Sequence, residues 1–273
     1  MDMDSKYVLL IIAVIIIISA YMVFTPGKQY ETIQIAGSTS VQPVVEKLAE
    51  KYQETHPNVR INVQGGGSGL GIRTAEQGIV DMGMSSKALS TEDKEGLNEY
   101  IIGKDGIIIA VNNDNPINNL SKDQIRDLFS GNITNWIEVG GSDIEVHVIV
   151  RESGSGTLSS FQDIIMGKTK IRKNAIVQSS TESVKQAVKQ DPGAIGFISL
   201  ANMDNSIKAI SVDGVAPSEQ SVANGTYLLQ RPFEILVKGE PTGIVKDFLD
   251  WVMGPEGQAI IKKQKIVPAS EIK

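Results

Sequence analysis

The chain has 273 residues, of which 41% are hydrophobic and 21% charged, as in an ordinary soluble globular protein long enough for two domains. A formal net charge of −6, without a basic patch interleaved with aromatic residues, argues against nucleic acid as a partner. The lack of cysteine excludes thiol nucleophiles, cysteine-based zinc sites and disulfides.

The N-terminal segment Tyr7–Phe24 is apolar apart from one serine and the tyrosine hydroxyls, and it is about long enough to cross a bilayer as one helix. A cleaved signal peptide is the alternative. Asp2 and Asp4 offset Lys6 in the preceding flank, and no A-x-A cleavage site ends the run. We therefore favour an uncleaved anchor, with residues 1–30 as signal or anchor segment and linker, and expect the rest of the chain to be exported.

Beyond the linker, strand and helix patterns alternate along the chain. Strands are predicted at residues 31–36, 59–64, 81–85, 107–111, 146–150, 193–200 and 231–237. Helices are predicted around residues 41–52, 72–79, 91–98, 121–129, 158–165, 183–189 and 242–253, with one more beginning at Pro255. This alternation predicts an α/β protein with mostly parallel sheets.

Three loops share one layout, in which a strand is followed by a turn of Gly, Ser and Thr and then by a helix. They are Gly37–Ser40, Gly65–Gly69 and Gly154–Thr157. In a parallel sheet such turns lie at the carboxyl ends of strands, where ligands bind. Backbone N–H groups and the helix dipole favour an anion there. Any one such loop is more often a plain turn, but three of them predict a shared anion site.

The third loop begins three residues after Arg151, whose planar fork of donors suits a tetrahedral oxyanion. Enzymatic alternatives are weaker, because the chain has no P-loop, dinucleotide fingerprint or nucleophile elbow. The two histidines, His56 and His147, form no recognisable metal pattern, and a Ser–His–Asp triad using His147 is disfavoured. Trp136 and Trp251 fall beside apolar helix positions and are predicted to lie in the core. We predict no enzyme, cofactor or metal.

Several separate motifs then occur in a characteristic order. They are Ala36–Pro43 (AGSTSVQP), Gln64–Gly71 (QGGGSGLG), Asp81–Ser86 (DMGMSS), Arg151–Thr157 (RESGSGT), Gly193–Leu200 and Arg231–Pro255. In this order they resemble the motifs of the periplasmic phosphate-binding proteins of ABC phosphate importers. The resemblance covers essentially all of the chain after residue 30.

The resemblance implies a two-lobed type II periplasmic-binding-protein fold, α/β in each lobe, with the ligand in the cleft between the lobes. Two crossing strands would join the lobes, the first after residue 111. We expect lobe 1 at residues 31–111, lobe 2 at residues 112–208, and the return crossing with the second part of lobe 1 at residues 209–273. In such proteins the lobes close on the ligand, and the closed form docks on a membrane permease.

The resemblance also implies that the ligand is inorganic phosphate, delivered outside the cytoplasmic membrane to an ABC transporter permease. We expect a monomer, anchored by its N-terminal helix or secreted after signal cleavage. The family's motifs place the following residues at phosphate: Ser38, Thr39, Ser40, Ser68, Ser86, Arg151, Ser155, Gly156 and Thr157. Arg151 would be the only formal positive charge on the anion.

Ser86 departs from many family members, which carry an aspartate there. That carboxylate accepts the proton of phosphate and repels sulfate, which has none. A serine carries no charge, so rejection of sulfate would depend on another group, with Glu152, Ser153 and Asp81 as candidates. The alternatives to phosphate delivery are a binding protein for another oxyanion, such as sulfate or molybdate, a phosphate sensor on the same fold, and, more distantly, a phosphate-ester hydrolase.

Overall fold

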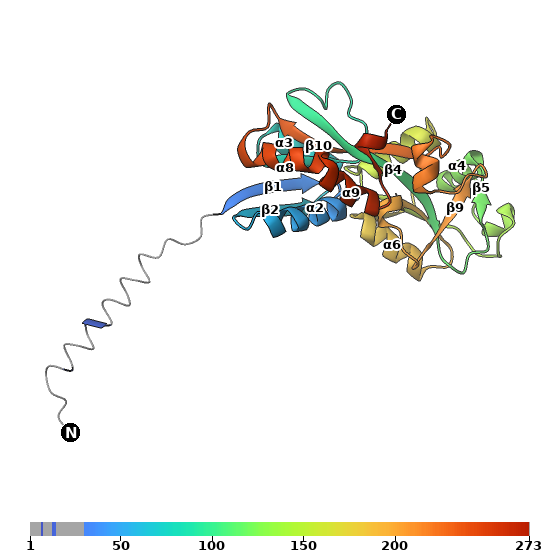
Figure 1. Cartoon of the computed structure of the whole chain (residues 1–273). Coiled ribbons are helices and arrows are strands. Elements are labelled where there is room, and N and C mark those ends of the chain that lie inside the picture. The colour runs from blue at the N-terminus through green and yellow to red at the C-terminus, as the bar shows by residue number, and fades with distance from the viewer. Residues whose placement is uncertain (1–6, 8–12, 15–29, 273) are drawn as a thin grey trace.

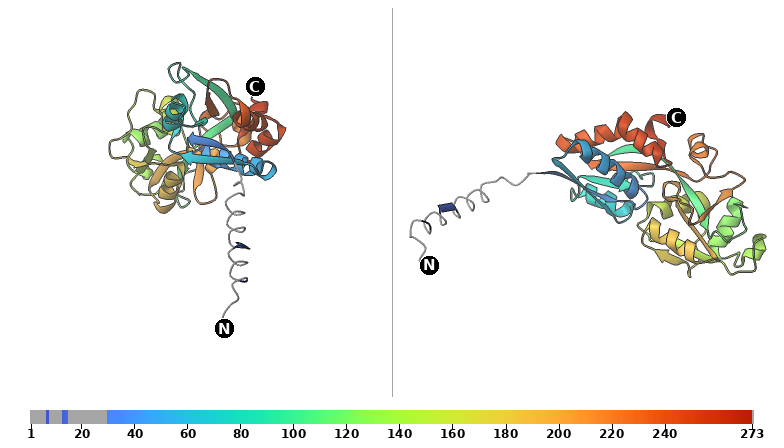
Figure 2. Two further views of the ribbon diagram at one scale, coloured as in Figure 1. Left: turned by 90° about the vertical axis from the view of Figure 1, so that its left-hand side faces the viewer. Right: turned by 60° about the horizontal axis from the view of Figure 1, so that its bottom comes forward.

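The computed structural model describes residues 30–272 together with Tyr7, Ala13 and Val14. The predicted membrane segment therefore lies almost wholly outside the described residues. Within the described part of the chain, no helix combines the length and the apolar character that a membrane span needs. Residues 30–272 form two halves, and the long strand β4 (Leu97–Val111) runs from one half into the other (Figures 1 and 2).

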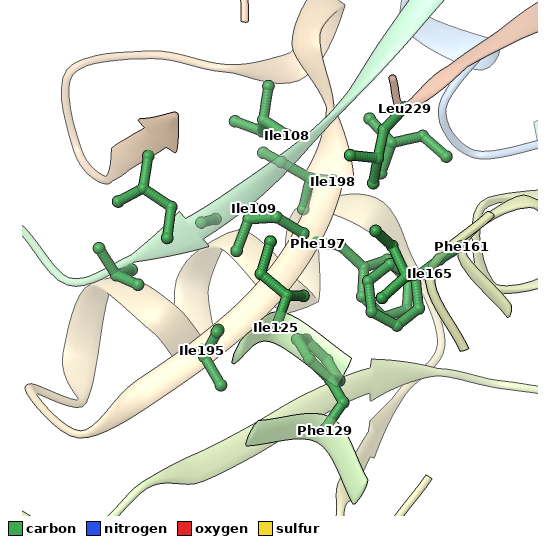
Figure 3. Packing of buried hydrophobic residues seen from close by; sticks show 14 of the residues in the cluster. Ile108, Ile109, Ile125, Phe129, Phe161, Ile165, Ile195, Phe197, Ile198 and Leu229 are labelled. Carbon is green, nitrogen blue, oxygen red and sulfur yellow. The ribbon is translucent and has the colours of Figure 1, made fainter. Parts of the chain in front are cut away.

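Two large hydrophobic cores define these halves, which we call lobe 1 and lobe 2. The lobe 1 core draws its buried residues from positions 33–102 and 233–266. The lobe 2 core draws on positions 107–229, with Val267 added from the end of the chain. In lobe 2, Phe161 stacks on Phe197 with ring centroids 4.2 Å apart, and Phe129 packs against both rings (Figure 3). Each lobe thus buries an apolar centre of its own.

The elements follow the alternating order that the sequence predicts. Before β4 the chain forms β1 (Glu31–Gly37), α2 (Gln42–Thr55), β2 (Val59–Gly65), α3 (Ser68–Glu76) and β3 (Met82–Ser85). Between β4 and β10 it forms β5 (Asn119–Leu120), α4 (Lys122–Ser130), η1 (Trp136–Val139), β6 (His147–Arg151), α5 (Gly156–Phe161), η2 (Gln162–Met166), β7 (Ile176–Gln178), α6 (Thr181–Gln190), β8 (Ala194–Ser199), η3 (Leu200–Asn202), β9 (Lys208–Val212) and α7 (Glu219–Ala223). The last part forms β10 (Gln230–Lys238), α8 (Gly243–Met253), α9 (Pro255–Lys263), β11 (Val267–Pro268) and η4 (Ala269–Glu271).

The sheet is continuous through both lobes, in the order β2-β1-β3-β10-β4-β8-β6-β7. The pairs β1–β2, β1–β3, β6–β8 and β6–β7 are parallel, as predicted. The strands that join the lobes are antiparallel to their neighbours, because β10 runs against β3 and β4, and β4 runs against β8. Strand β4 pairs with β10 as far as Gly106 and with β8 from Ile107 onward, so it changes partner where the two cores meet.

One predicted helix is absent. Residues 91–96 form turns, and the chain enters β4 at Leu97 instead of continuing a helix to residue 98. Gly96 has a φ of +75°, a left-handed conformation that ends the turn and that glycine adopts without strain. Strand β4 therefore begins well before the apolar run at residues 107–111 from which it was predicted.

Candidate functional site

All three predicted loops meet between the lobes, each at the start of a helix. Ser38 and Ser40 lie just before α2, Ser68 is the first residue of α3, and Ser155 caps α5 by accepting a hydrogen bond from the Leu158 N–H at 3.3 Å. Gly67, directly before α3, has a φ of +87°, which a residue with a side chain adopts only under strain. Local turn chemistry therefore brings helix N-termini from both lobes to one place.

Three serine hydroxyls from lobe 1 form one hydrogen-bonded cluster. The Ser38 hydroxyl donates to the Ser86 hydroxyl at 2.8 Å, and the hydroxyls of Ser68 and Ser86 lie 3.3 Å apart. The Ser86 N–H also donates to the Ser68 hydroxyl at 3.0 Å. All three side chains are buried, so their hydroxyl groups depend on neighbouring protein groups or on a ligand for hydrogen bonds.

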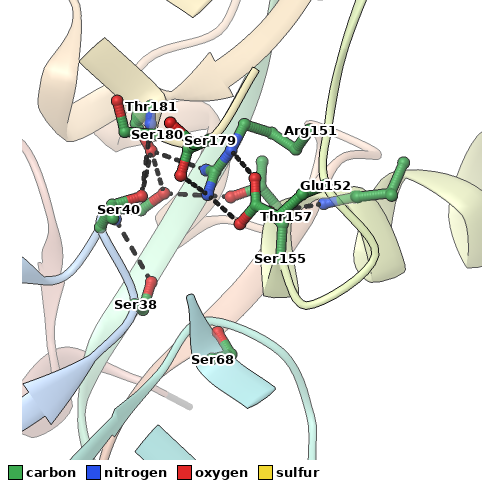
Figure 4. Close-up of polar contacts among 12 residues, drawn as sticks. Ser38, Ser40, Ser68, Arg151, Glu152, Ser155, Thr157, Ser179, Ser180 and Thr181 are labelled. Atoms are coloured by element: carbon green, nitrogen blue, oxygen red, sulfur yellow. Dashed lines mark hydrogen bonds and ion pairs between the residues drawn. The ribbon is translucent and has the colours of Figure 1, made fainter. Parts of the chain in front are cut away.

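Threonine hydroxyls from lobe 2 reach the same place. Ser40 of lobe 1 hydrogen-bonds with Thr157 at 3.0 Å and with Thr181 at 2.9 Å (Figure 4). Thr39 hydrogen-bonds with Thr181 at 3.3 Å. These contacts join residues more than a hundred positions apart in the sequence, and they close the cleft over the serine cluster.

Glycines allow the two lobes to approach this closely. A Cβ on Gly156 would lie 2.3 Å from the Ser68 hydroxyl and 2.8 Å from that of Ser86. The Gly69 N–H of α3 donates to the Gly154 carbonyl across the cleft at 3.0 Å. Glycine at position 156 is therefore a steric requirement for the closed cleft, with the first residue of α5 pressed against lobe 1 hydroxyls.

Arg151 lies at the end of β6 with its side chain buried. Its Nη1 donates to the Thr181 hydroxyl at 3.1 Å, which connects it to the Ser40 hydroxyl beyond. Its Nε and Nη2 bind the two carboxylate oxygens of Glu152 at 3.0 and 2.8 Å. The guanidinium is thus held rigidly by its neighbour in the sequence, with one donor left on the cleft side.

A second arginine, Arg231 of β10, lies in the same network and was not predicted. Its Nη1 donates to the Thr157 hydroxyl at 2.7 Å and to the Ser86 hydroxyl and carbonyl at 3.2 and 3.1 Å. One guanidinium edge thus contacts both lobes. Arg151 is therefore not the only formal positive charge here, contrary to the expectation from the sequence.

Asp105 of β4 holds Arg231 in place. The Arg231 Nε and Nη2 bind one carboxylate oxygen of Asp105 at 3.1 and 3.0 Å, and the Ser199 hydroxyl donates to the other at 2.9 Å. Burial raises the pKa of the Asp105 carboxyl, and the adjacent guanidinium opposes that rise. A guanidinium keeps its proton, so Arg231 stays positively charged beside this carboxyl group. Residues 105 and 231 are also register partners of β4 and β10, beside the point where β4 changes partner.

Thr181 is the other residue that the sequence analysis missed. It is the first residue of α6 and follows β7 and the helix cap Ser180. The layout of strand, hydroxyl-bearing turn and helix is therefore the one used to find the other loops. The turn before Thr181 lacks the glycine that marks the three predicted loops. Only a pattern of Ser and Thr residues before a helix start could therefore have identified Thr181 from the sequence.

The candidate proton acceptors suggested in place of an aspartate at Ser86 lie in different surroundings. Glu152 uses both carboxylate oxygens on Arg151. Ser153 is exposed, and Asp81 precedes β3, at the end opposite Ser86, where it accepts a hydrogen bond from the Gln34 N–H at 2.7 Å. Of the three, only Glu152 stands next to the hydroxyl network.

A cavity of about 250 Å³ adjoins the network and is lined from both lobes. Lobe 1 contributes Gly69, Arg73 and Lys87, and lobe 2 contributes residues 153–156. His147 lies at the start of β6, the opposite end from Arg151, where its Nδ1 contacts the Asp191 carboxylate at 2.7 Å. The chemistry of the cleft is therefore that of hydroxyl, amide and guanidinium donors, a set that suits a tetrahedral oxyanion.

A two-lobed α/β molecule with two joining strands and a polar cleft between the lobes is a solute-binding protein of the type II periplasmic class. The model of the PBP superfamily domain matches residues 23–256 of the chain. The phosphate-binding protein PstS of Bacillus subtilis is 33% identical over 249 residues, covering 89% of this chain and 82% of the relative.

Solved structures agree. A phosphate ABC transporter substrate-binding protein from Clostridium perfringens, with bound phosphate, is 38% identical with a TM-score of 0.85, over 88% of this chain and 100% of that one. An ABC-type phosphate transport receptor from Vibrio cholerae is 36% identical with a TM-score of 0.72, over 86% and 99%. The chain therefore belongs to the PBP superfamily and, within it, to the family of PstS phosphate-binding proteins, which are binding proteins of transport systems.

Proposed function

We propose that this protein binds inorganic phosphate in the cleft between its lobes and delivers it to the permease of an ABC importer. The observation that carries the proposal is the single hydrogen-bond network in which hydroxyls of both lobes and two guanidinium groups converge. We assign phosphate contacts to the predicted residues Ser38, Thr39, Ser40, Ser68, Ser86, Arg151, Gly156 and Thr157, and add Arg231 and Thr181. Ser155 contributes by capping α5, whose N-terminus faces the cleft.

The charges of the site support binding by dipoles as well as by ions. Each guanidinium is already paired with a carboxylate, Arg151 with Glu152 and Arg231 with Asp105, so the formal charges of these four groups cancel. A bound phosphate would take its hydrogen bonds from hydroxyls, helix N-terminal N–H groups and the remaining guanidinium donors. This balance lets an acidic protein hold an anion without a large local excess of positive charge.

We further propose that the lobes are joined at residues 103–106 and 229–232 rather than at residues 111–112 and 208–209. The reason is that the lobe 2 core includes Ile107, Ile210 and Leu229, whereas Ile102 and Phe233 belong to the lobe 1 core. The Asp105–Arg231 pair would then sit at the hinge itself. Arg231 would connect hinge, ligand and both lobes, which is the connection that closure on a ligand requires.

We propose that the chain works outside the cytoplasmic membrane as a monomer, with Tyr7–Phe24 as its anchor. The apolar length of that segment and the transport role of the family support this location. The test is to probe the size and membrane attachment of the protein in its native cell. A mature protein that lacks residues 7–24 and is released to the medium would establish the cleaved-signal alternative.

Calorimetric titration of the full chain in detergent, near neutral pH, tests the ligand. We expect saturable, one-to-one binding of phosphate and much weaker binding of sulfate. Sulfate binding as tight as phosphate binding would keep the oxyanion site and overturn the phosphate assignment. No heat with either anion would overturn both.

A further inference from the structure

A second cavity lies away from the oxyanion site, in lobe 1. It has a volume of about 580 Å³ and is lined by the last turn of α2, the turn before β2, the start of β1 and one face of α8. Glu31 lines it from the first residue of β1, whereas the oxyanion site follows the last residue of that strand. The volume is in the range of small-molecule sites.

Aromatic rings form one wall of this cavity. The rings of Tyr52 and His56 stack with centroids 3.8 Å apart, and Trp251 meets Tyr52 edge-on at 5.3 Å. The indole Nε1 of Trp251 donates to the Glu256 carboxylate at 2.9 Å, which fixes the orientation of the ring. Contrary to the prediction of a core position, Trp251 is only half-buried, whereas Trp136 is 1% exposed.

Carboxylates without a cation line the same cavity. Glu31 and Asp247 form no ion pair with any residue in the described part of the chain, whereas Asp250 pairs with Lys246. Helix α2 ends at the cavity with no basic residue in its last turn, so the negative end of its dipole is not offset there. Ile244, Asp247 and Trp251 follow helical spacing on α8, which aims one face of that helix at the cavity.

The Tyr52 hydroxyl supplies an independent sign of a ligand. Tyr52 is 2% exposed, yet no hydrogen bond joins its hydroxyl to another residue among those described. Tyr52, Glu31 and Asp247 line the same cavity, and burial, followed by the carboxylates of Asp247 and Glu31, raises the pKa of the Tyr52 hydroxyl. The hydroxyl oxygen is not among the fully buried atoms that lack a partner, so its open side faces the cavity that Tyr52 lines, where a bound molecule can reach it.

We propose that this cavity binds an alkylammonium or guanidinium group, either of a small free amine or of a basic side chain on a partner polypeptide. Two unpaired carboxylates supply the charge, the half-buried ring of Trp251 supplies cation–π contact, and the Tyr52 hydroxyl accepts a hydrogen bond. A metal ion does not fit, because no group of three or more metal-ligating side chains occurs in the described part of the chain. The proposal does not depend on phosphate binding, because it uses none of the same residues.

The test is calorimetric titration of the full chain in detergent with agmatine, which carries both cationic groups. A second titration uses a blocked glycine peptide that contains one arginine. The neutral control is the same peptide with citrulline in place of the arginine. We expect agmatine to bind in the millimolar range or tighter and to change the fluorescence of Trp251. Binding of agmatine alone assigns the cavity to a free amine. Binding of the arginine peptide, but not of the citrulline peptide, assigns it to a basic side chain.

The matched variants are Asp247→Asn and Glu54→Gln. Both remove one negative charge from lobe 1, but Glu54 lies outside the cavity, where it pairs with Lys51. Asp247→Asn should weaken cation binding about tenfold, and Glu54→Gln should leave it unchanged. Phosphate affinity is measured in both variants and should stay at the wild-type value. That result would show that both variants are folded. Absence of binding by both probes, or equal binding to the wild type and Asp247→Asn, would overturn the proposal.

Discussion

The two buried arginines of the cleft are held in opposite ways. Arg151 pairs with Glu152, the next residue in the chain, whose side chain is 31% exposed. Arg231 pairs with Asp105, more than a hundred residues away, and both side chains are essentially inaccessible, at 1% and 0% exposed. One pair is local and reaches solvent, whereas the other connects the two strands that join the lobes.

Because of this difference in burial, loss of either arginine should affect stability and ligand binding to different degrees. A buried carboxylate that loses its cation is costly, because the protein interior does not solvate the remaining charge. A carboxylate that reaches water is less affected. We therefore expect Arg231 to contribute to the stability of the whole molecule as well as to ligand binding, and Arg151 to contribute mainly to ligand binding.

The largest effect is expected from Arg231→Ala. It should lower the free energy of unfolding by roughly 3–5 kcal/mol, because Asp105 remains buried without its partner, and it should abolish phosphate binding. Chemical denaturation and calorimetry measure the two effects. The double variant Arg231→Met with Asp105→Leu is the control, since it removes both charges. It should regain most of the stability but none of the binding. If the double variant is no more stable than Arg231→Ala, the pair is not the cause.

Arg151→Ala should weaken phosphate binding about ten- to hundredfold, because a charge-assisted hydrogen bond in a closed cleft contributes about 1.5–3 kcal/mol. Its melting temperature should stay close to that of the wild type, in contrast to Arg231→Ala. Glu152→Gln is the matched control, since it keeps the guanidinium and removes the negative charge that pairs with it. Near-normal affinity of Arg151→Ala in calorimetry would remove Arg151 from the site.

Ser86→Asp should raise the preference for phosphate over sulfate. Ser86 is fully buried, and its hydroxyl lies 3.2 Å from the Arg231 Nη1 and 2.8 Å from the Ser38 hydroxyl. A carboxylate there would accept the phosphate proton and repel an oxyanion that has none. The affinity ratio of the two anions is measured by competition, with Ser86→Ala as the control that removes the hydroxyl without adding charge. An unchanged ratio in Ser86→Asp would show that position 86 does not sense the proton.

The smallest effect concerns Glu234, which lies on β10 three residues after Arg231 but has a carboxyl group, Glu99, as its neighbour instead of a cation. Burial, and then its hydrogen bond with Glu99, raise the pKa of Glu234 to about 9. The unfolded chain releases this proton near pH 4.5, so between about pH 4.5 and 9 the folded state binds more protons, and stability falls as pH rises.

Glu234→Gln removes this titration. The melting temperature of the variant, relative to that of the wild type, should therefore rise as the pH is raised from about 5 to about 8. Thermal melts of both proteins across that range measure the difference, with Glu240→Gln as an exposed control near the end of the same strand. Parallel melting curves at every pH would contradict a raised pKa.

The sequence predicted the parts of the site that depend on local chemistry. The glycine- and serine-containing loops, the cap at Ser155 and the end of β6 at Arg151 follow from residues within a few positions of one another. Arg231 was missed because it stands in an apolar strand pattern, and its partner Asp105 is placed by the antiparallel register of β4 and β10. The predicted helix at residues 91–98 failed for a related reason, since pairing with β10 draws Leu97 and its neighbours into a strand.

The division of the two cores along the chain also bears on how the protein is made. Nearly all of the lobe 2 core comes from one uninterrupted stretch, whereas the lobe 1 core needs residues from both ends of the folded region. A chain that is synthesised from the N-terminus onward can therefore complete lobe 2 while strands β1, β2 and β3 still lack β10. During synthesis, the half that is encoded first is completed last, and its apolar strands are the part most exposed to aggregation in the meantime.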